Sequence, residues 1–175
     1  MAQTFGQWLL CLKHYGLMCV FLSSPERLPS NPLCILISVF AYLLIGLLLV
    51  DEQRGMAAVS AQIFLEVITL ALAAYAGLYW KKSLSRFQQT FSALVGINLV
   101  ISAVAIPIFR LVANGSENAV DINSLRLMTE LLIVIWNLAV LSLIFKRAFA
   151  ISTQLSAIMS FNYYLVYQFL VIWFF

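Results

Sequence analysis

The chain has 175 residues, of which 63% are hydrophobic and 10% are charged, and its formal net charge is +3. Soluble domains average about 45–50% apolar and about 25% charged residues, so these proportions exclude a water-soluble protein of this size. The weak and scattered positive charge does not indicate a nucleic-acid partner. The three cysteines form no CxxC pair and the chain has a single histidine, so we expect neither a disulfide framework nor a metal site.

Long apolar runs fill most of the chain, and each is long enough for the roughly 20 residues that a bilayer crossing needs. We predict an all-α fold, a polytopic membrane helix bundle with about five transmembrane helices and an N-terminal amphipathic helix. The whole chain, residues 1–175, then forms a single membrane domain, and the lipid bilayer is its first expected partner. The crossings are predicted over residues 33–50, 56–80, 87–112, 125–145 and 155–175.

The N-terminal segment differs from these runs because polar residues interrupt it. Gln7 and His14 fall near one side of a helical wheel, which is typical of an interfacial helix, here over residues 3–22. Two alternatives remain open: the segment packs against the bundle, or it forms a sixth crossing, against which Lys13 argues. Residues 23–32 contain three prolines, which remove backbone donors and restrict the preceding residues, so this stretch is predicted to be a linker.

Basic residues are shared unevenly between the two ends of the predicted bundle. With the N-terminus inside, seven of them lie on the cytoplasmic side and three on the other. Short loops follow the positive-inside rule, so we expect an integral membrane protein, in a bacterial inner membrane, with a cytoplasmic N-terminus and an external C-terminus. The cytoplasmic set is Lys13, Arg27, Lys81, Lys82, Arg86, Lys146 and Arg147, and the external set is Arg54, Arg110 and Arg126.

Glu66 is the most informative residue inside an apolar run. A carboxylate near the centre of a crossing costs about 2.5–3.5 kcal/mol on insertion scales, so Glu66 is expected to face protein or water. It is either a proton- or cation-responsive carboxylate in a transport path, or a protonated side chain that hydrogen-bonds a neighbouring helix. Gln62 lies one turn earlier, and Asn98 and Asn137 lie in the third and fourth crossings. We expect these amides to be hydrogen-bond partners of this kind or members of the same path.

Charged residues gather near the predicted outer interface. Glu130 lies one turn after Arg126, and Arg110 lies near the end of the neighbouring crossing. These three residues are predicted to form an interfacial charge cluster. The alternative is a set of solvated or snorkelling helix ends.

The last crossing carries a polar aromatic face made of Tyr164, Tyr167 and Gln168. Hydroxyls and amides deep in a span need partners, so this face is expected to be buried against protein. That protein is either the same chain or another subunit. The three residues are therefore candidates for contact with a partner.

Two further features concern helix packing. Small residues recur at a spacing of four, Ala73 with Gly77 and Ser92 with Gly96, which indicates positions where another helix approaches closely. Pro107 is predicted to bend the third crossing near its far end.

Two stretches carry a resemblance to a known family. Residues 25–29 read Pro-Glu-Arg-Leu-Pro and lead into the first crossing, and residues 86–96 read Arg-Phe-Gln-Gln-Thr-Phe-Ser-Ala-Leu-Val-Gly and lead to Pro107. Together with the helix count, they resemble the bacterial branch of the Yip1-type membrane proteins. The resemblance implies a cytoplasmic N-terminus, about five crossings and a role in membrane organisation or assembly, with no catalytic residues to carry over. The aspartate- and tyrosine-bearing signatures of the eukaryotic branch are absent from this sequence.

Motifs of the common enzyme classes are missing: the sequence has no GxSxG, HExxH, Walker or dinucleotide-binding pattern. We therefore expect no enzymatic activity and no cofactor. The favoured hypothesis is a small scaffold or accessory subunit that acts through helix–helix contacts with a partner membrane protein. The alternative is a small homo-oligomeric transporter or channel whose path includes Gln62, Glu66, Asn98 and Asn137. Another integral membrane protein, or a second copy of the chain, is accordingly the expected protein partner.

Overall fold

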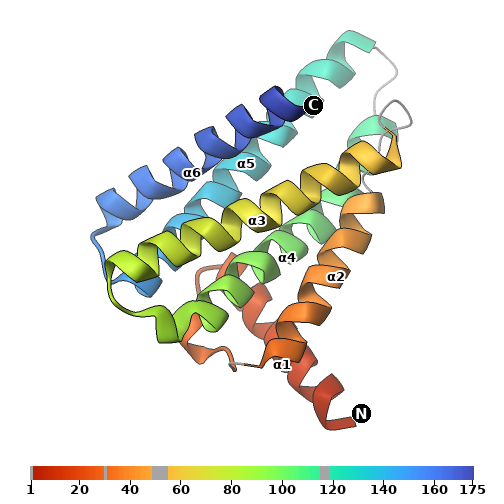
Figure 1. The fold of residues 1–175 in the computed structure, drawn as a ribbon. Coiled ribbons are helices and arrows are strands. Elements are labelled where there is room, and N and C mark those ends of the chain that lie inside the picture. The colour runs from red at the N-terminus through yellow and green to blue at the C-terminus, as the bar shows by residue number, and fades with distance from the viewer. Residues whose placement is uncertain (1, 30, 49–54, 115–118) are drawn as a thin grey trace.

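The computed structural model of the chain describes residues 2–29, 31–48, 55–114 and 119–175, and every regular element in these ranges is a helix (Figure 1). The prediction of an all-α fold is confirmed to this extent. The elements are α1 (Ala2–Cys19), the 3-10 turn η1 (Pro25–Arg27), α2 (Pro32–Leu48), α3 (Met56–Trp80), the 3-10 turn η2 (Leu84–Arg86), α4 (Phe87–Asn114), α5 (Ala119–Phe149) and α6 (Thr153–Phe174).

Four helical segments are long and apolar enough to cross a membrane: Met56–Trp80, Leu84–Val112, Ser124–Phe149 and Thr153–Phe174. They are consistent with an integral membrane protein. Helix α2 has 17 residues, or about 25 Å at 1.5 Å per residue, against a hydrocarbon core of about 30 Å. The predicted first crossing continues to Val50, which lies outside the described residues together with the charged stretch 51–54.

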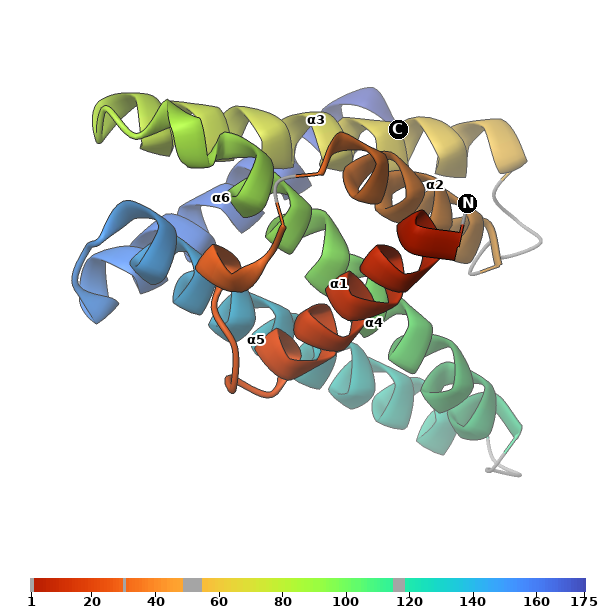
Figure 2. The same cartoon turned by 90° about the horizontal axis from the view of Figure 1, so that it is seen from below.

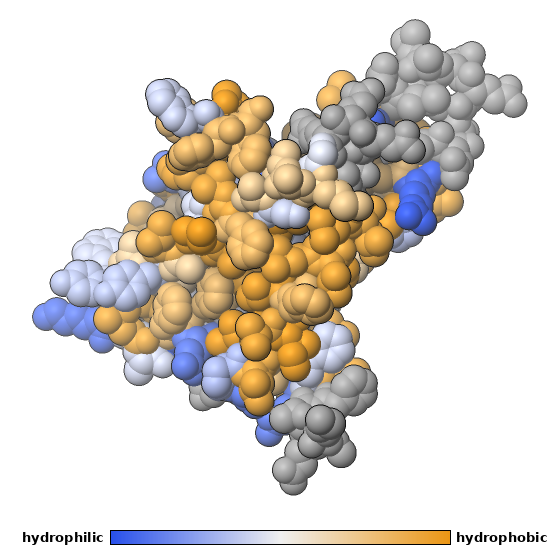
Figure 3. Space-filling model, turned by 45° about the vertical axis from the view of Figure 1, so that its right-hand side comes forward, coloured by the Kyte–Doolittle hydropathy of each residue, from blue (hydrophilic) through white to orange (hydrophobic). Residues whose placement is uncertain are grey.

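Apolar side chains also cover much of the outer surface, as expected for helices that face lipid. Orange residues fill the middle of the face in Figure 3, and hydrophilic residues lie toward its edges. Leu72, Phe169 and Ile172 are each more than 60% exposed. In water such a surface would drive aggregation, whereas in a bilayer it is the natural contact with acyl chains.

Helix α4 is the central helix of the bundle. It contacts α1, α2, α3 and α5, and residues 92–99 are all buried, so it has no solvent- or lipid-facing side over two turns. A helix that is apolar all round is expected at such a position. Helices α1, α2, α3 and α5 pack around α4, and α6 packs against α5 and α3 (Figure 1).

Helix α1 packs across α4 instead of running alongside it (Figure 2). Its contact face is a stripe of buried residues at helical spacing, Cys11, Tyr15 and Met18, while Lys13 on the opposite side is exposed. The Tyr15 hydroxyl lies 3.2 Å from Ser38 Oγ and 2.6 Å from Ser92 Oγ. One tyrosine therefore joins α1 to both α2 and α4.

The small residues of α3 and α4 make room for aromatic rings. A Cβ atom added at Gly96 would overlap the ring of Tyr15, and one added at Gly77 would overlap the ring of Phe149. The sequence predicted close helix approach at these glycines. The structure shows that a side-chain ring from α1 or α5 takes up the space, because the missing Cβ leaves a flat recess in the helix surface.

Residues 23–29 do more than connect α1 with α2. The guanidinium of Arg86 in η2 forms an ion pair with Glu26 in η1, and Arg147 near the end of α5 donates a hydrogen bond to the carbonyl oxygen of Ser23. The linker thus contacts both the turn between α3 and α4 and the C-terminal end of α5. These contacts define one end of the bundle, here called the linker end.

The buried cysteines give a direct test of how α1 packs. Burial raises the pKa of the Cys19 thiol to about 12, and Cys11 and Cys34 are also buried. Between pH 7 and 9 the Cys19 thiol stays protonated, and the thiolate is the reactive form. We expect a maleimide to label Cys19 in the folded chain at less than about 1% of its rate on the denatured chain throughout this pH range. Mass spectrometry after timed quenching measures the rate, and fast labelling of Cys19 in the folded chain would contradict the described packing.

Candidate functional site

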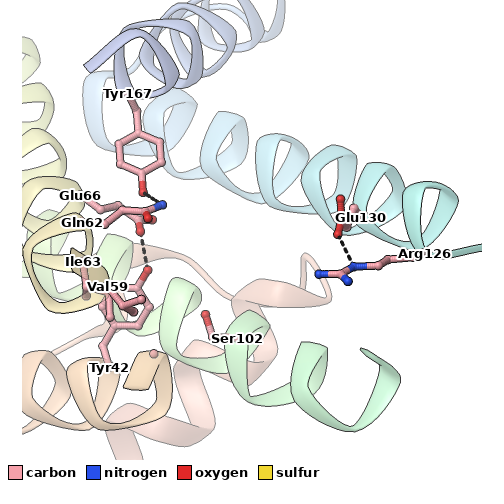
Figure 4. Close-up of a pocket in the computed structure, with 10 residues that line it drawn as sticks. Tyr42, Val59, Gln62, Ile63, Glu66, Ser102, Arg126, Glu130 and Tyr167 are labelled. Atoms are coloured by element: carbon pink, nitrogen blue, oxygen red, sulfur yellow. Dashed lines mark hydrogen bonds and ion pairs between the residues drawn. The ribbon is translucent and has the colours of Figure 1, made fainter. Parts of the chain in front are cut away.

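A polar cavity of about 460 Å³ lies between α2, α3, α4, α5 and α6. Its lining comes from the second halves of α2, α4 and α6 and from the first halves of α3 and α5, so it lies toward the end of the bundle opposite the linker end. Figure 4 shows the side chains around it. The lining residues are Tyr42, Gly46, Val59, Gln62, Ile63, Glu66, Ser102, Arg126, Glu130 and Tyr167.

Glu66 is held between two tyrosines from different helices. Tyr42 Oη on α2 donates to Glu66 Oε2 at 2.7 Å, and Gln62 Nε2, one turn before Glu66 on α3, lies 3.3 Å from Tyr167 Oη on α6. In Figure 4 Tyr42 and Tyr167 approach this part of α3 from opposite sides. The carboxylate is thus fixed in place, and because it is only half-buried, it keeps a surface that faces the cavity.

A close contact between α2 and α3 positions Tyr42. Gly46, one turn after Tyr42, faces the side chain of Ile63, and a Cβ atom at Gly46 would overlap Ile63 Cδ1. Tyr42 and Ile63 belong to a small apolar cluster with Val95 and Leu99 on α4. Packing of this cluster therefore sets the distance between the phenol of Tyr42 and the carboxylate on α3.

A second, smaller cavity of about 100 Å³ adjoins the first, and Glu66 and Tyr167 line both. On its far side Asn137 Nδ2 on α5 donates to Asn98 Oδ1 on α4 at 2.8 Å. The four polar residues predicted from the sequence to act together are thus gathered around two cavities that meet at Glu66. The smaller cavity is lined by Glu66, Asn98, Ile133, Val134, Asn137, Leu138, Leu141, Tyr163, Tyr164 and Tyr167.

Tyr163 carries the only buried side-chain hydroxyl for which the described residues offer no hydrogen-bond partner. Its ring lines the small cavity and also a groove between α3 and α6. A buried, unpaired phenol costs about 1–3 kcal/mol. Tyr163 thus brings an unpaired hydroxyl to the site.

Of the predicted charge cluster, two members are paired. Arg126 Nε lies 3.2 Å from Glu130 Oε1, on the wall of the larger cavity away from Glu66 (Figure 4). Both side chains are about half exposed, so the pair contributes only about 0–1 kcal/mol to stability. Arg110 is exposed near the end of α4 and does not line the cavity. It forms no ion pair with any acidic side chain in the described part of the chain.

The tyrosine face of α6 points into the chain's own bundle. Tyr167 contacts Gln62, and Gln168 Nε2 donates to Tyr164 Oη at 3.0 Å. All three predicted residues of this face are half-buried. Tyr167 thus has a partner on another helix of the chain, and Gln168 and Tyr164 are bonded to each other, while contact of this face with a second protein stays a prediction.

Neither Tyr42 nor Tyr163 was expected at this site from the sequence. Tyr42 and Ser38 are the two side chains with hydroxyls inside the first apolar run, which was a usable signal. Tyr163 directly precedes Tyr164 of the predicted face of α6. Nothing in the sequence indicates that these two neighbouring tyrosines have different surroundings. Only the packing of α6 against α5 distinguishes the two.

The chemistry available at this site is that of the Glu66 carboxylate surrounded by amides and phenols, with the Arg126–Glu130 ion pair on the far wall of the larger cavity. No group of three or more His, Cys, Asp or Glu side chains that could hold a metal ion occurs among the residues that the structure describes. None of the protein-family models, curated proteins or solved structures compared with this chain matches it. The resemblance to Yip1-type proteins stays a prediction.

Proposed function

We propose that the chain is a small membrane transporter or channel whose path passes Glu66, with a proton or a small cation as the species that the carboxylate binds. The observation that carries this proposal is that Glu66 lines two cavities. The larger, polar cavity lies toward one end of the bundle, and the smaller one also borders the Asn98–Asn137 pair. A carboxylate kept open to a cavity inside a bundle is typical of ion and proton pathways.

The scaffold or accessory-subunit hypothesis is the second proposal, and its support is weaker. It depended on polar and aromatic faces that need a protein neighbour. The hydroxyls and amides of the α6 face are bonded within the chain, so that need is reduced. A homo-oligomeric state remains part of the transporter proposal, and native mass spectrometry of the protein from its own membranes tests it.

The proposed membrane arrangement has five crossings: the four longer segments and, in addition, α2. The membrane is a bacterial inner membrane, and the linker end faces the cytoplasm. Support comes from the basic residues at the linker end, such as Arg27, Arg86 and Arg147. The positive-inside rule would place these residues in the cytoplasm. Local bilayer thinning accommodates a helix about 5 Å too short. The larger cavity then opens to the outside.

Flux measurements test the proposal. In liposomes that contain the purified protein, we expect an imposed pH or sodium gradient to dissipate, and Glu66→Gln to reduce this flux to the level of protein-free liposomes. The amide can still accept the hydrogen bond from Tyr42 but cannot bind a proton or balance a cation. Glu26→Gln, the same change at an exposed position of the linker end, is the matched control and should keep the wild-type flux. Gradient-dependent flux that persists in Glu66→Gln would overturn the carboxylate mechanism.

A further inference from the structure

The small cavity is selective in its electrostatics. Among the residues that the structure describes, its lining has one carboxylate, from Glu66, and no lysine, arginine or histidine. The arginine of the site, Arg126, lines only the larger cavity, where Glu130 neutralises it. The small cavity therefore favours a positive charge and disfavours an anion. A single negative charge balances a monovalent ion, whereas divalent ions usually need more than one carboxylate.

The oxygen atoms that line the small cavity are not all used within the protein. Asn137 donates its Nδ2 to Asn98, which leaves Asn137 Oδ1 available as an acceptor. Glu66 accepts from Tyr42 at Oε2 and also interacts with the Tyr167 hydroxyl, and a carboxylate has lone pairs beyond two such contacts. The hydroxyl of Tyr163 has no partner among the described residues. A carboxylate, an amide oxygen and a phenol hydroxyl thus keep acceptor capacity among the residues that line the cavity.

The size of the cavity limits what that occupant can be. About 100 Å³ holds about three water molecules, or one dehydrated cation with one or two waters. Protonation of Glu66 alone would satisfy the carboxylate, but it would leave the Tyr163 hydroxyl and the Asn137 oxygen as they are. A hard cation bound by oxygen atoms uses all three groups at once.

We infer that the small cavity is a binding site for an alkali-metal cation, ligated by Glu66, Asn137 and Tyr163. The inference rests on the proposed function and deepens it, because it names the ion that occupies the path. Glu66 supplies the charge, and the two neutral oxygens replace part of the hydration shell. An ion that enters through the larger cavity would pass Gln62 and Tyr167 before it reaches this site.

Thermal unfolding in detergent tests the site without any transport measurement. A ligand that binds only the folded chain raises its Tm, by about 5–10 °C at a hundred times its Kd for a chain of this size. We expect NaCl to raise the Tm of the wild-type protein relative to N-methylglucamine chloride at the same ionic strength. KCl in place of NaCl distinguishes a sodium site from one that accepts either ion.

Variants assign the ligands. Tyr163→Phe removes one oxygen and keeps the ring, so it should fold and lose most of the sodium-dependent shift, and Glu66→Gln should lose all of it. Tyr75→Phe, the same change at a half-exposed tyrosine of α3 that lines neither cavity, should keep the shift. Equal Tm values in the sodium and N-methylglucamine salts, or a full shift in either Tyr163→Phe or Glu66→Gln, would overturn the inference.

The two proposals can fail separately. If Tm does not respond to sodium but flux still depends on Glu66, the cation site is wrong and the carboxylate path stands. If Tm responds in the expected pattern but liposomes show no Glu66-dependent flux, the site stands and the transport proposal falls.

Discussion

Replacement of Tyr15 by alanine is expected to lower the free energy of unfolding by about 3–5 kcal/mol, the usual cost of removing a large buried aromatic side chain. Tyr15 is fully buried, and its hydroxyl contacts serines on α2 and α4. Without its ring, α1 loses the side chain that holds it against the recess at Gly96. Thermal or denaturant unfolding in detergent measures the loss.

The milder change Tyr15→Phe separates packing from hydrogen bonding. It keeps the ring but leaves the hydroxyls of Ser38 and Ser92, both buried, without this partner, at a cost of about 1–3 kcal/mol. The rate of Cys19 alkylation should rise in the same order, from wild type through Tyr15→Phe to Tyr15→Ala. Equal losses in the two variants would mean that the ring itself contributes nothing to the docking of α1.

The second large effect is expected from Gly96→Ala. The added methyl group would overlap the buried Tyr15 ring, and overpacking of this kind costs about 1–3 kcal/mol. Gly16→Ala, on the same α1–α4 pair, is the matched control because no atom lies within 4 Å of the position that its Cβ would take. That control should stabilise the chain by about 0.5–1 kcal/mol, since alanine is the better helix former.

A double-mutant cycle shows whether the two residues act through each other. In a Tyr15→Ala background the recess at Gly96 is empty, so the added methyl group should cost nothing and should even stabilise α4 slightly. If Gly96→Ala destabilises both backgrounds equally, the contact between Gly96 and the Tyr15 ring is not the cause.

The sequence was most informative where polar residues interrupt apolar runs. A carboxylate or amide in lipid is expensive, so Glu66, Gln62, Asn98 and Asn137 had to face the interior, and the structure gathers them around two cavities. The helices themselves followed from the lengths of the runs. The run for α3 was predicted over residues 56–80, the range that the helix occupies.

Other features could not be read from the sequence, because the lipid and the interior of a membrane protein are equally apolar surroundings for a helix. Residues 92–99 of α4, surrounded by protein, look no different from the lipid-facing part of α3, so the central position of α4 was not predicted. Tyr42 and Tyr163 matter through contacts between helices that are far apart in the sequence. Such pairings depend on how the helices are arranged, which the pattern of apolar residues leaves open.

The contacts of α1 also dictate the order in which the chain is assembled. The indole of Trp136 donates to the carbonyl oxygen of Cys19 at 2.9 Å, and Arg147 reaches Ser23, so the first helix is completed by residues 117 and 124 positions further along the chain. At about 5–20 residues per second, translation needs about 6–25 s to make them. The helix that leaves the ribosome first therefore cannot complete these contacts until most of α5 has been made, long after the partners of Tyr15 on α2 and α4 are available.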